Sequence, residues 1–117
     1  MTRRSPTQAS GDAAEDRALS FLVGRGLGLV ARNVASRLGE IDLVMRDGDT
    51  LVFVEVRSRS RTDFGGAAAS VGPAKQRRLR REAQRYLVAH FGDRWPACRF
   101  DVCAFDGTAI DWIRDAF

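Results

Sequence analysis

The stretch Gly39–Ser58, GEIDLVMRDGDTLVFVEVRS, decides the fold, because Asp47-Gly48-Asp49 separates two apolar runs within it. An Asp-Gly pair between alternating hydrophobic residues is a strong signal for a β-hairpin. The runs Glu40–Arg46 and Thr50–Ser58 are rich in Ile, Leu, Val and Phe, which favours strands. The stretch therefore predicts two antiparallel strands joined by a short turn.

The two predicted strands bring acidic side chains together, because side chains alternate between the faces of a strand. A Gly48-Asp49 turn places Asp42 directly opposite Glu55, and an Asp47-Gly48 turn places it beside Glu55. A three-residue loop would instead separate the two acids. With either two-residue turn, the side chains that share one face are Glu40, Asp42, Glu55 and Arg57. The opposite face of the first strand is predicted to carry Ile41, Leu43 and Met45.

The predicted acidic face needs a compensating positive charge. Like charges at opposing strand positions destabilise a sheet, and carboxylates are rarely buried without a partner. Arg57, another basic side chain or a divalent metal ion would meet this need. Asp42 and Glu55 therefore have two interpretations: strand acids neutralised by Arg57 and Arg37, or ligands of a metal.

The size and composition of the chain indicate one soluble domain. Its 117 residues are enough for a substantial core, and we predict a disordered tail over residues 1–9 followed by a domain over 10–117. No apolar run approaches the ~20 residues of a membrane span, and the basic N-terminus lacks the apolar stretch of a secretory signal. The expected location is the cytoplasm, with no membrane partner.

The charge of the chain favours a polyanionic partner. Nineteen Lys and Arg residues exceed fifteen Asp and Glu residues, giving a net charge of +4. Lys75 is the only lysine, and the fork of the arginine side chain matches phosphate geometry well. A GC-rich genome would also enrich arginine.

The remaining sequence completes an α/β pattern. Asp12 and Glu15 fit a capping box, which predicts a helix from Asp12 to about Val23. Arg59–Gly72 has no clear period and predicts a loop. The other predicted elements are a strand at Leu27–Asn33, a helix at Pro73–Phe91, and strands at Arg99–Phe105 and Thr108–Ile113. The order α-β-β-β-α-β-β predicts a mixed sheet with two helices.

The second predicted helix is amphipathic and strongly basic. Its predicted inner stripe consists of Leu79, Ala83, Tyr86, Leu87 and His90. Its other faces carry six cations and one acid, Glu82. Such a face can be merely solvated, but this excess of positive charge favours contact with nucleic acid. The predicted contacts are Lys75, Arg77, Arg78, Arg81 and Arg85.

A family resemblance becomes visible along most of the chain. The segments that carry it are GDAAEDRA from Gly11, GEID from Gly39, FVEVR from Phe53, Lys75-Gln76 and RFDV from Arg99. In this order and spacing the sequence resembles the YraN-like family of small bacterial proteins. The resemblance implies a restriction-endonuclease-like core of the PD-(D/E)XK superfamily, similar to archaeal Holliday-junction resolvases. The implied architecture is a mixed sheet of about five strands flanked by two main helices.

The resemblance also implies roles for individual residues. Asp42 and Glu55 match the carboxylates that bind Mg²⁺ or Mn²⁺ in the superfamily. Glu15 matches an acid that some resolvases place on their first helix, although it is also a capping-box residue. Arg57 stands where the superfamily motif has Lys. Because arginine is not deprotonated in proteins, Arg57 is left to orient water or to stabilise phosphate charge.

Further residues are candidates on chemical grounds. The Val56 backbone carbonyl lies between Glu55 and Arg57 in sequence and would add an oxygen ligand to the metal. Glu40 and Lys75 are candidates for positioning or activating the attacking water. Glu40 at a strand start and Lys75 in a first helical turn also suit purely structural positions.

Three functions therefore remain open. The first is a metal-dependent nuclease-like protein that hydrolyses phosphodiester bonds in DNA, including branched or recombining DNA. The second is a nucleic-acid-binding module without catalysis, which the Arg57 substitution favours. The third is a protein-interaction domain that reuses the nuclease fold. Many nucleases of this fold are dimers, so the resemblance adds a homodimer to the expected assemblies.

Overall fold

The computed structural model describes residues 6–58 and 71–117, with side chains described from residue 12 onward. The elements, in chain order, are α1 (Pro6–Gly24), β1 (Gly28–Ser36), β2 (Gly39–Asp47), β3 (Thr50–Ser58), α3 (Pro73–Phe91), β4 (Cys98–Asp106) and β5 (Ala109–Ile113). This order confirms the predicted α/β class and the sequence of elements. The predicted loop Arg59–Gly72 lies mostly outside the described residues.

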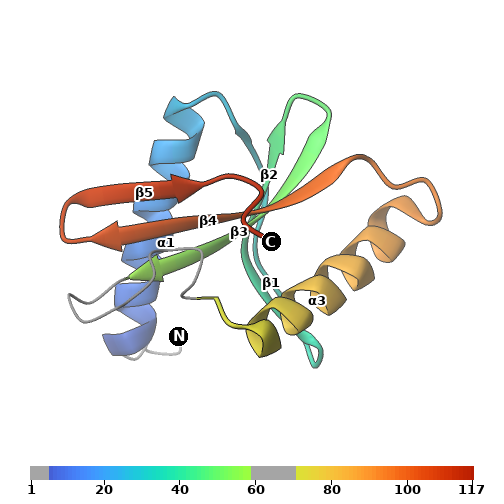
Figure 1. Cartoon of the computed structure of the whole chain (residues 1–117), viewed down its shortest axis with the longest axis horizontal. Helices are drawn as coiled ribbons and strands as arrows, with labels where there is room; N and C mark the ends of the chain where they lie inside the picture. The colour runs from blue at the N-terminus through green and yellow to red at the C-terminus, as the bar shows by residue number, and fades with distance from the viewer. Residues whose placement is uncertain (1–5, 59–70) are drawn as a thin grey trace, which may run out of the picture.

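The strands form one five-stranded mixed sheet in the order β1-β2-β3-β4-β5. All neighbouring strands are antiparallel except β3 and β4, which are parallel. A parallel pair needs a crossover connection, and α3 lies within it. Figure 1 shows the sheet between the two helices, with α1 and α3 on opposite sides. The strand β3 therefore lies at the centre of the sheet, with both helices packed over it.

The hairpin between β2 and β3 has the predicted Gly48-Asp49 turn. Asp47 pairs with Thr50, so Gly48-Asp49 is the two-residue loop, and Gly48 has a φ of 59°. A left-handed conformation at this position suits glycine, which has no Cβ. The pairing continues to Leu43 opposite Val54, so the next two residues along the strands are Asp42 and Glu55.

Two apolar clusters fill the two faces of the sheet. The cluster under α3 includes Leu51 and Phe53, and the cluster under α1 includes Val52 and Val54. This alternation along β3 is the predicted one. The predicted face of Ile41 is wrong, because Ile41 packs in the α3 cluster, whereas Leu43 packs in the α1 cluster. The regular pairing of β2 with β3 ends between Asp42 and Leu43, and the strict alternation along β2 ends with it.

Helix α1 begins earlier than predicted. It starts at Pro6, a residue that suits the first helical turn. Asp12 therefore lies inside the helix, and the predicted capping box is wrong. Residues 1–5 of the predicted tail lie outside the described residues, and the domain boundary at residue 10 stays a prediction. Strand β1 is also longer than predicted and runs to Ser36.

Helix α3 has the predicted bounds, but its buried stripe differs at one position. The buried residues are Leu79, Glu82, Ala83, Tyr86 and Leu87, whereas His90 is exposed. The Glu82 carboxylate accepts hydrogen bonds from Ser36 Oγ and, at 2.9 Å, from Arg85 Nε. These bonds allow a carboxylate to replace an apolar residue in the stripe. They also attach the end of β1 to α3.

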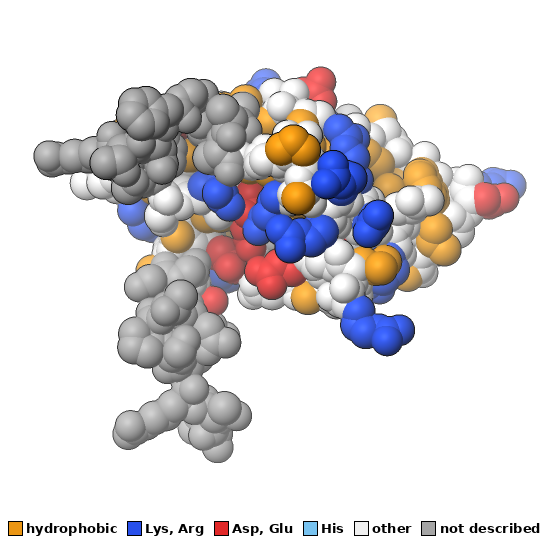
Figure 2. Space-filling model, turned by 60° about the horizontal axis from the view of Figure 1, so that its bottom comes forward, with side chains coloured by type: hydrophobic (Ala, Val, Ile, Leu, Met, Phe, Trp, Pro, Cys, Tyr) orange, Lys and Arg blue, Asp and Glu red, His pale blue; other side chains and the backbone are white. Residues whose placement is uncertain are grey.

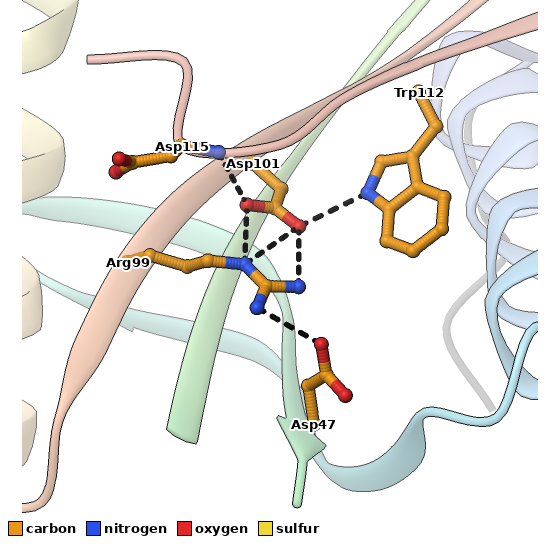
Figure 3. A network of polar contacts seen from close by, with 5 residues as sticks. All are labelled: Asp47, Arg99, Asp101, Trp112 and Asp115. Atoms are coloured by element: carbon orange, nitrogen blue, oxygen red, sulfur yellow. Dashed lines mark hydrogen bonds and ion pairs between the residues drawn. The ribbon is translucent and has the colours of Figure 1, made fainter.

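A buried aspartate fastens the C-terminal segment to the sheet (Figure 3). Asp101 on β4 is 0% exposed and accepts hydrogen bonds from Arg99 Nε at 3.0 Å, Trp112 Nε1 at 3.0 Å and the Asp115 N–H at 2.9 Å. Arg99 also donates to Asp47 Oδ2 at 2.9 Å. Asp101 is therefore paired with an arginine inside the protein. The network joins β2, β4 and the residues after β5.

Candidate active site

The structure brings Asp42 and Glu55 together at the end of the regular β2–β3 pairing. Both are buried, with exposed fractions of 9% and 5%. Figure 2 shows acidic side chains gathered near the middle of one face, with basic side chains directly beside them. A pair of carboxylates on adjacent strands was the central expectation from the sequence. Its surroundings are compared below with what the metal-binding and the purely structural interpretation each require.

Glu55 is only partly compensated by its surroundings. Its Oε1 atom lies 3.2 Å from Lys75 Nζ and 3.8 Å from Arg57 Nη1. Its Oε2 atom is buried and has no hydrogen-bond partner among the described residues. The pKa of Glu55 is raised from 4.5 to about 7, because burial and the charge of Asp42 raise it by more than Lys75 and Arg57 lower it. The site therefore holds a carboxylate whose negative charge the protein does not fully satisfy.

Asp42 is held in place by the neighbouring strand. Its Oδ2 atom accepts a hydrogen bond of 2.8 Å from the Val56 N–H. Burial raises the pKa of Asp42, the Val56 N–H opposes this, and the charge of Glu40 raises it again. The side chain thus takes a backbone donor of β3 just beyond the regular β2–β3 pairing. Arg37, the arginine expected to neutralise this acid in the structural interpretation, forms no ion pair with it.

Glu15 joins the edge of the site from α1. It is 8% exposed, and its Oε1 atom lies 3.7 Å from Arg32 Nη2. In the amide orientation that satisfies its own donors and acceptors, Asn33 donates to Glu15 Oε1 at 2.9 Å. Burial raises the pKa of Glu15, and the charge of Asp42 adds to the increase. The charge of Asp42 thus acts on Glu15, and a role for Glu15 in the site stays a prediction.

Asn33 is not among the site residues predicted from the sequence. Its φ of 53° is left-handed, a conformation that asparagine tolerates better than most residues. An asparagine within a predicted strand is a weak signal of such a position. The sequence gives no sign that Asn33 faces Glu15, because the two residues belong to different elements.

Lys75 enters the site from the first turn of α3. Pro73 occupies the start of this helix, and the Gln76 side chain donates to the Val71 carbonyl at 2.8 Å. These features fix where α3 begins, and therefore where Lys75 lies. Its Nζ is closer to Glu55 than the Arg57 guanidinium is. The Lys75 amine on α3 therefore lies near Glu55, as does Arg57, which occupies the motif position where the resemblance leads one to expect lysine.

The donor set fits Mg²⁺ or Mn²⁺. Mg²⁺ is commonly bound by one or two carboxylates together with water and substrate phosphate. Asp42 and Glu55 provide two carboxylates, and the unpartnered Glu55 Oε2 is a suitable oxygen donor. No group of three or more His, Cys, Asp or Glu residues within the described ranges is arranged to hold a metal ion. The pair would therefore be the principal protein ligands, and the Val56 carbonyl and Glu15 stay predictions.

The basic residues predicted on α3 divide into different environments. Arg77, Arg78 and Arg81 are exposed. Arg85 is half-buried and bound to Glu82, so its charge is already compensated within the protein. Lys75 is directed to Glu55. The exposed arginines are therefore the stronger candidates for contact with a phosphate backbone.

Comparison with known proteins agrees with the resemblance noted in the sequence. Residues 14–105 match the family described as "Uncharacterised protein family UPF0102". This chain belongs to UPF0102. A UPF0102 protein of Ralstonia nicotianae is 63% identical over 113 residues, covering 93% of this chain and 86% of the relative. The UPF0102 protein YraN of Escherichia fergusonii is 51% identical over 116 residues, covering 98% and 88%.

The UPF0102 match includes the whole candidate site. It runs from just before Glu15 on α1 to the end of β4, and so contains Glu40, Asp42, Glu55 and Lys75. The names of these relatives state no reaction. No helix in the described part of this UPF0102 chain has the length and apolar character required to cross a membrane.

Proposed function

We propose that this UPF0102 protein is a metal-dependent nuclease that hydrolyses phosphodiester bonds in DNA, including branched or recombining DNA. One observation carries the proposal. Asp42 and Glu55 are buried side by side, and Glu55 keeps one carboxylate oxygen without a partner among the described residues. A buried carboxylate in this state is costly unless a cation joins it. Strongly perturbed acids of this kind concentrate at functional sites.

The residues of the chain divide the work of hydrolysis. When bound, Mg²⁺ or Mn²⁺ neutralises phosphate charge and lowers the pKa of water. The Val56 N–H holds the Asp42 carboxylate in a fixed orientation. Lys75 lies beside Glu55, where its amine is placed to orient the attacking water or to stabilise developing negative charge. Arg57 contributes positive charge and hydrogen-bond donors, but not a general base.

DNA cleavage by purified protein tests the proposal. Linear and branched DNA are incubated with Mg²⁺ or Mn²⁺ and the wild type, Asp42→Asn or Glu55→Gln. These isosteric changes preserve shape and remove charge, so we expect each to lower the cleavage rate by on the order of 100-fold or more. Asp93→Asn, a change at an exposed loop acid, is the control and should cleave normally. Undiminished cleavage by both site variants would overturn the assignment.

A second candidate is a nucleic-acid-binding module without catalysis. The ion pair between Lys75 and Glu55 favours it, because it partly neutralises the site without a metal. This function predicts salt-sensitive DNA binding with no metal-dependent turnover. A protein-interaction domain predicts instead that complexes survive nuclease treatment. The homodimer implied by the resemblance stays a prediction, which sedimentation in solution would test.

A further inference from the structure

A groove runs directly beside the carboxylate pair, between the β1–β2 turn and α3. It has a volume of about 380 Å³. Its lining includes Ser36, Arg37, Gly39, Glu40, Lys75 and Arg78. Lys75 contacts Glu55, and the charge of Glu40 raises the pKa of Asp42. The groove and the candidate site therefore share walls.

The two walls of this groove each carry an exposed arginine. Arg37 comes from the turn, and Arg78 comes from α3. Neither guanidinium makes a hydrogen bond or an ion pair within residues 12–58 and 71–117, in contrast to Arg85 and Arg99. Arginine side chains that remain unpaired on opposite sides of one groove present donors to an anion between them.

The walls are held in a fixed relation by direct contacts. Ser36 Oγ donates to the buried Glu82 carboxylate and accepts the Leu38 N–H at 3.0 Å. At Gly39, a Cβ atom would lie 2.9 Å from the Arg78 carbonyl oxygen, so the turn approaches the helix as closely as glycine allows. This attachment organises the groove in advance of any ligand, which reduces the cost of binding.

We propose that this groove binds the sugar–phosphate backbone of the strand that enters the candidate site, with Arg37 and Arg78 contacting phosphate from opposite walls. The inference rests on the proposed function for the identity of the ligand. It adds Arg37, which the sequence reasoning considered only as a neutraliser of the strand acids. It also separates Arg78 from Arg77 and Arg81, which do not line the groove.

The lining also indicates how the groove would recognise a nucleic-acid strand. Among the residues that the structure describes, no aromatic side chain lines the groove, so these residues supply no stacking platform of the kind on which bases are commonly held. Contacts to phosphate carry no direct sequence information. Binding in the groove should therefore depend on salt and be indifferent to base composition.

Fluorescence anisotropy with labelled single-stranded oligonucleotides tests the groove without requiring cleavage. Asp42→Asn protein, in Ca²⁺ or without metal, is titrated across a range of salt concentrations. Arg37→Ala and Arg78→Ala are compared in this background with Arg94→Ala, which removes an exposed arginine from a loop away from the groove. Circular dichroism and thermal unfolding of each variant confirm that it is folded.

We expect each groove variant to weaken binding and to reduce the slope of log K against log salt by about 0.7, the value for one phosphate contact on a single strand. Arg94→Ala should retain the parent slope, and oligonucleotides of different base composition should bind alike. Parent-like slopes in both folded groove variants, or no binding at low salt, would overturn the groove assignment. If the groove variants show the expected reduced slopes but the wild type does not cleave DNA, the nuclease proposal alone would be overturned.

Discussion

Two buried acids on neighbouring strands, Asp101 and Glu55, have opposite surroundings. Asp101 is 0% exposed, and both of its oxygens accept hydrogen bonds, from Arg99, Trp112 and the Asp115 N–H (Figure 3). Glu55 is 5% exposed, and one of its oxygens has no partner among the described residues. The first acid is used to hold the fold together. The second keeps unsatisfied negative charge, as a binding site for a cation would.

The largest expected effect on stability is at Asp101. Asp101→Ala leaves the part-buried Arg99 guanidinium, the Trp112 Nε1–H and a backbone N–H without their acceptor. We expect the free energy of unfolding to fall by about 3 kcal/mol, measured by urea denaturation. Asp93→Ala, at an exposed acid, should change it little. A small loss at Asp101 would remove the contrast between the two acids.

The pH dependence of stability should reveal the state of Glu55. Its pKa is raised from 4.5 to about 7, so between these values the folded state binds more protons than the unfolded state. The stability contributed by this carboxyl is therefore complete at low pH and falls as pH rises through this window. In metal-free protein, we expect the free energy of unfolding of the wild type to fall across this pH window by on the order of 2 kcal/mol more than that of Glu55→Gln. Parallel pH profiles for the two proteins would contradict the raised pKa.

Metal binding should restore the stability that is lost when Glu55 becomes charged, and it should not involve Asp101, whose oxygens already accept hydrogen bonds. At a metal concentration about ten times Kd, Mn²⁺ should stabilise the wild type by about 1.4 kcal/mol. Thermal unfolding at a pH above 7 measures this, because the carboxylates are then charged. Asp42→Asn and Glu55→Gln should lose the stabilisation, whereas Asp93→Asn should keep it. Equal stabilisation of all four proteins would place the metal elsewhere.

The smallest expected effect concerns Glu82, which resembles Asp101 more than Glu55. Glu82 is 0% exposed, and although burial raises its pKa, the bonds from Arg85 and Ser36 lower it below the ordinary value. Ser36→Ala removes one of these donors and should cost about 1 kcal/mol of stability. Chemical denaturation alongside Ser20→Ala, an exposed position on α1, provides the measurement and control. A neutral result would mean that Arg85 alone satisfies this acid.

Local sequence signals were sufficient for the elements and for the central pair of acids. Asp-Gly between apolar runs predicted the hairpin, and Pro73 marked the start of α3 correctly. The alternation of side chains then placed Asp42 beside Glu55, once a two-residue turn was assumed. These features depend on neighbours in the chain, so periodicity and turn chemistry reveal them.

The remaining features depend on contacts between distant segments. Glu82 looked like part of a solvated basic face, because its partner Ser36 belongs to another element. Lys75 was only one of several candidates until the start of α3 was placed beside β3. Asp12 fitted a helix cap, but α1 extends upstream to Pro6. In each case the tertiary partner, or the true end of the element, was not encoded in a local pattern.

The central position of β3 has a consequence for how this site can change. β3 is paired along one edge with β2 and along the other with β4. Sliding it by one residue would break both ladders and turn Glu55 toward the opposite helix. The β2–β3 pairing, by contrast, ends at Leu43, and beyond it the Asp42 carboxylate is attached to β3 by the hydrogen bond from the Val56 N–H. The glutamate thus lies within a continuous ladder with β4, whereas the aspartate carboxylate reaches β3 through a single backbone donor.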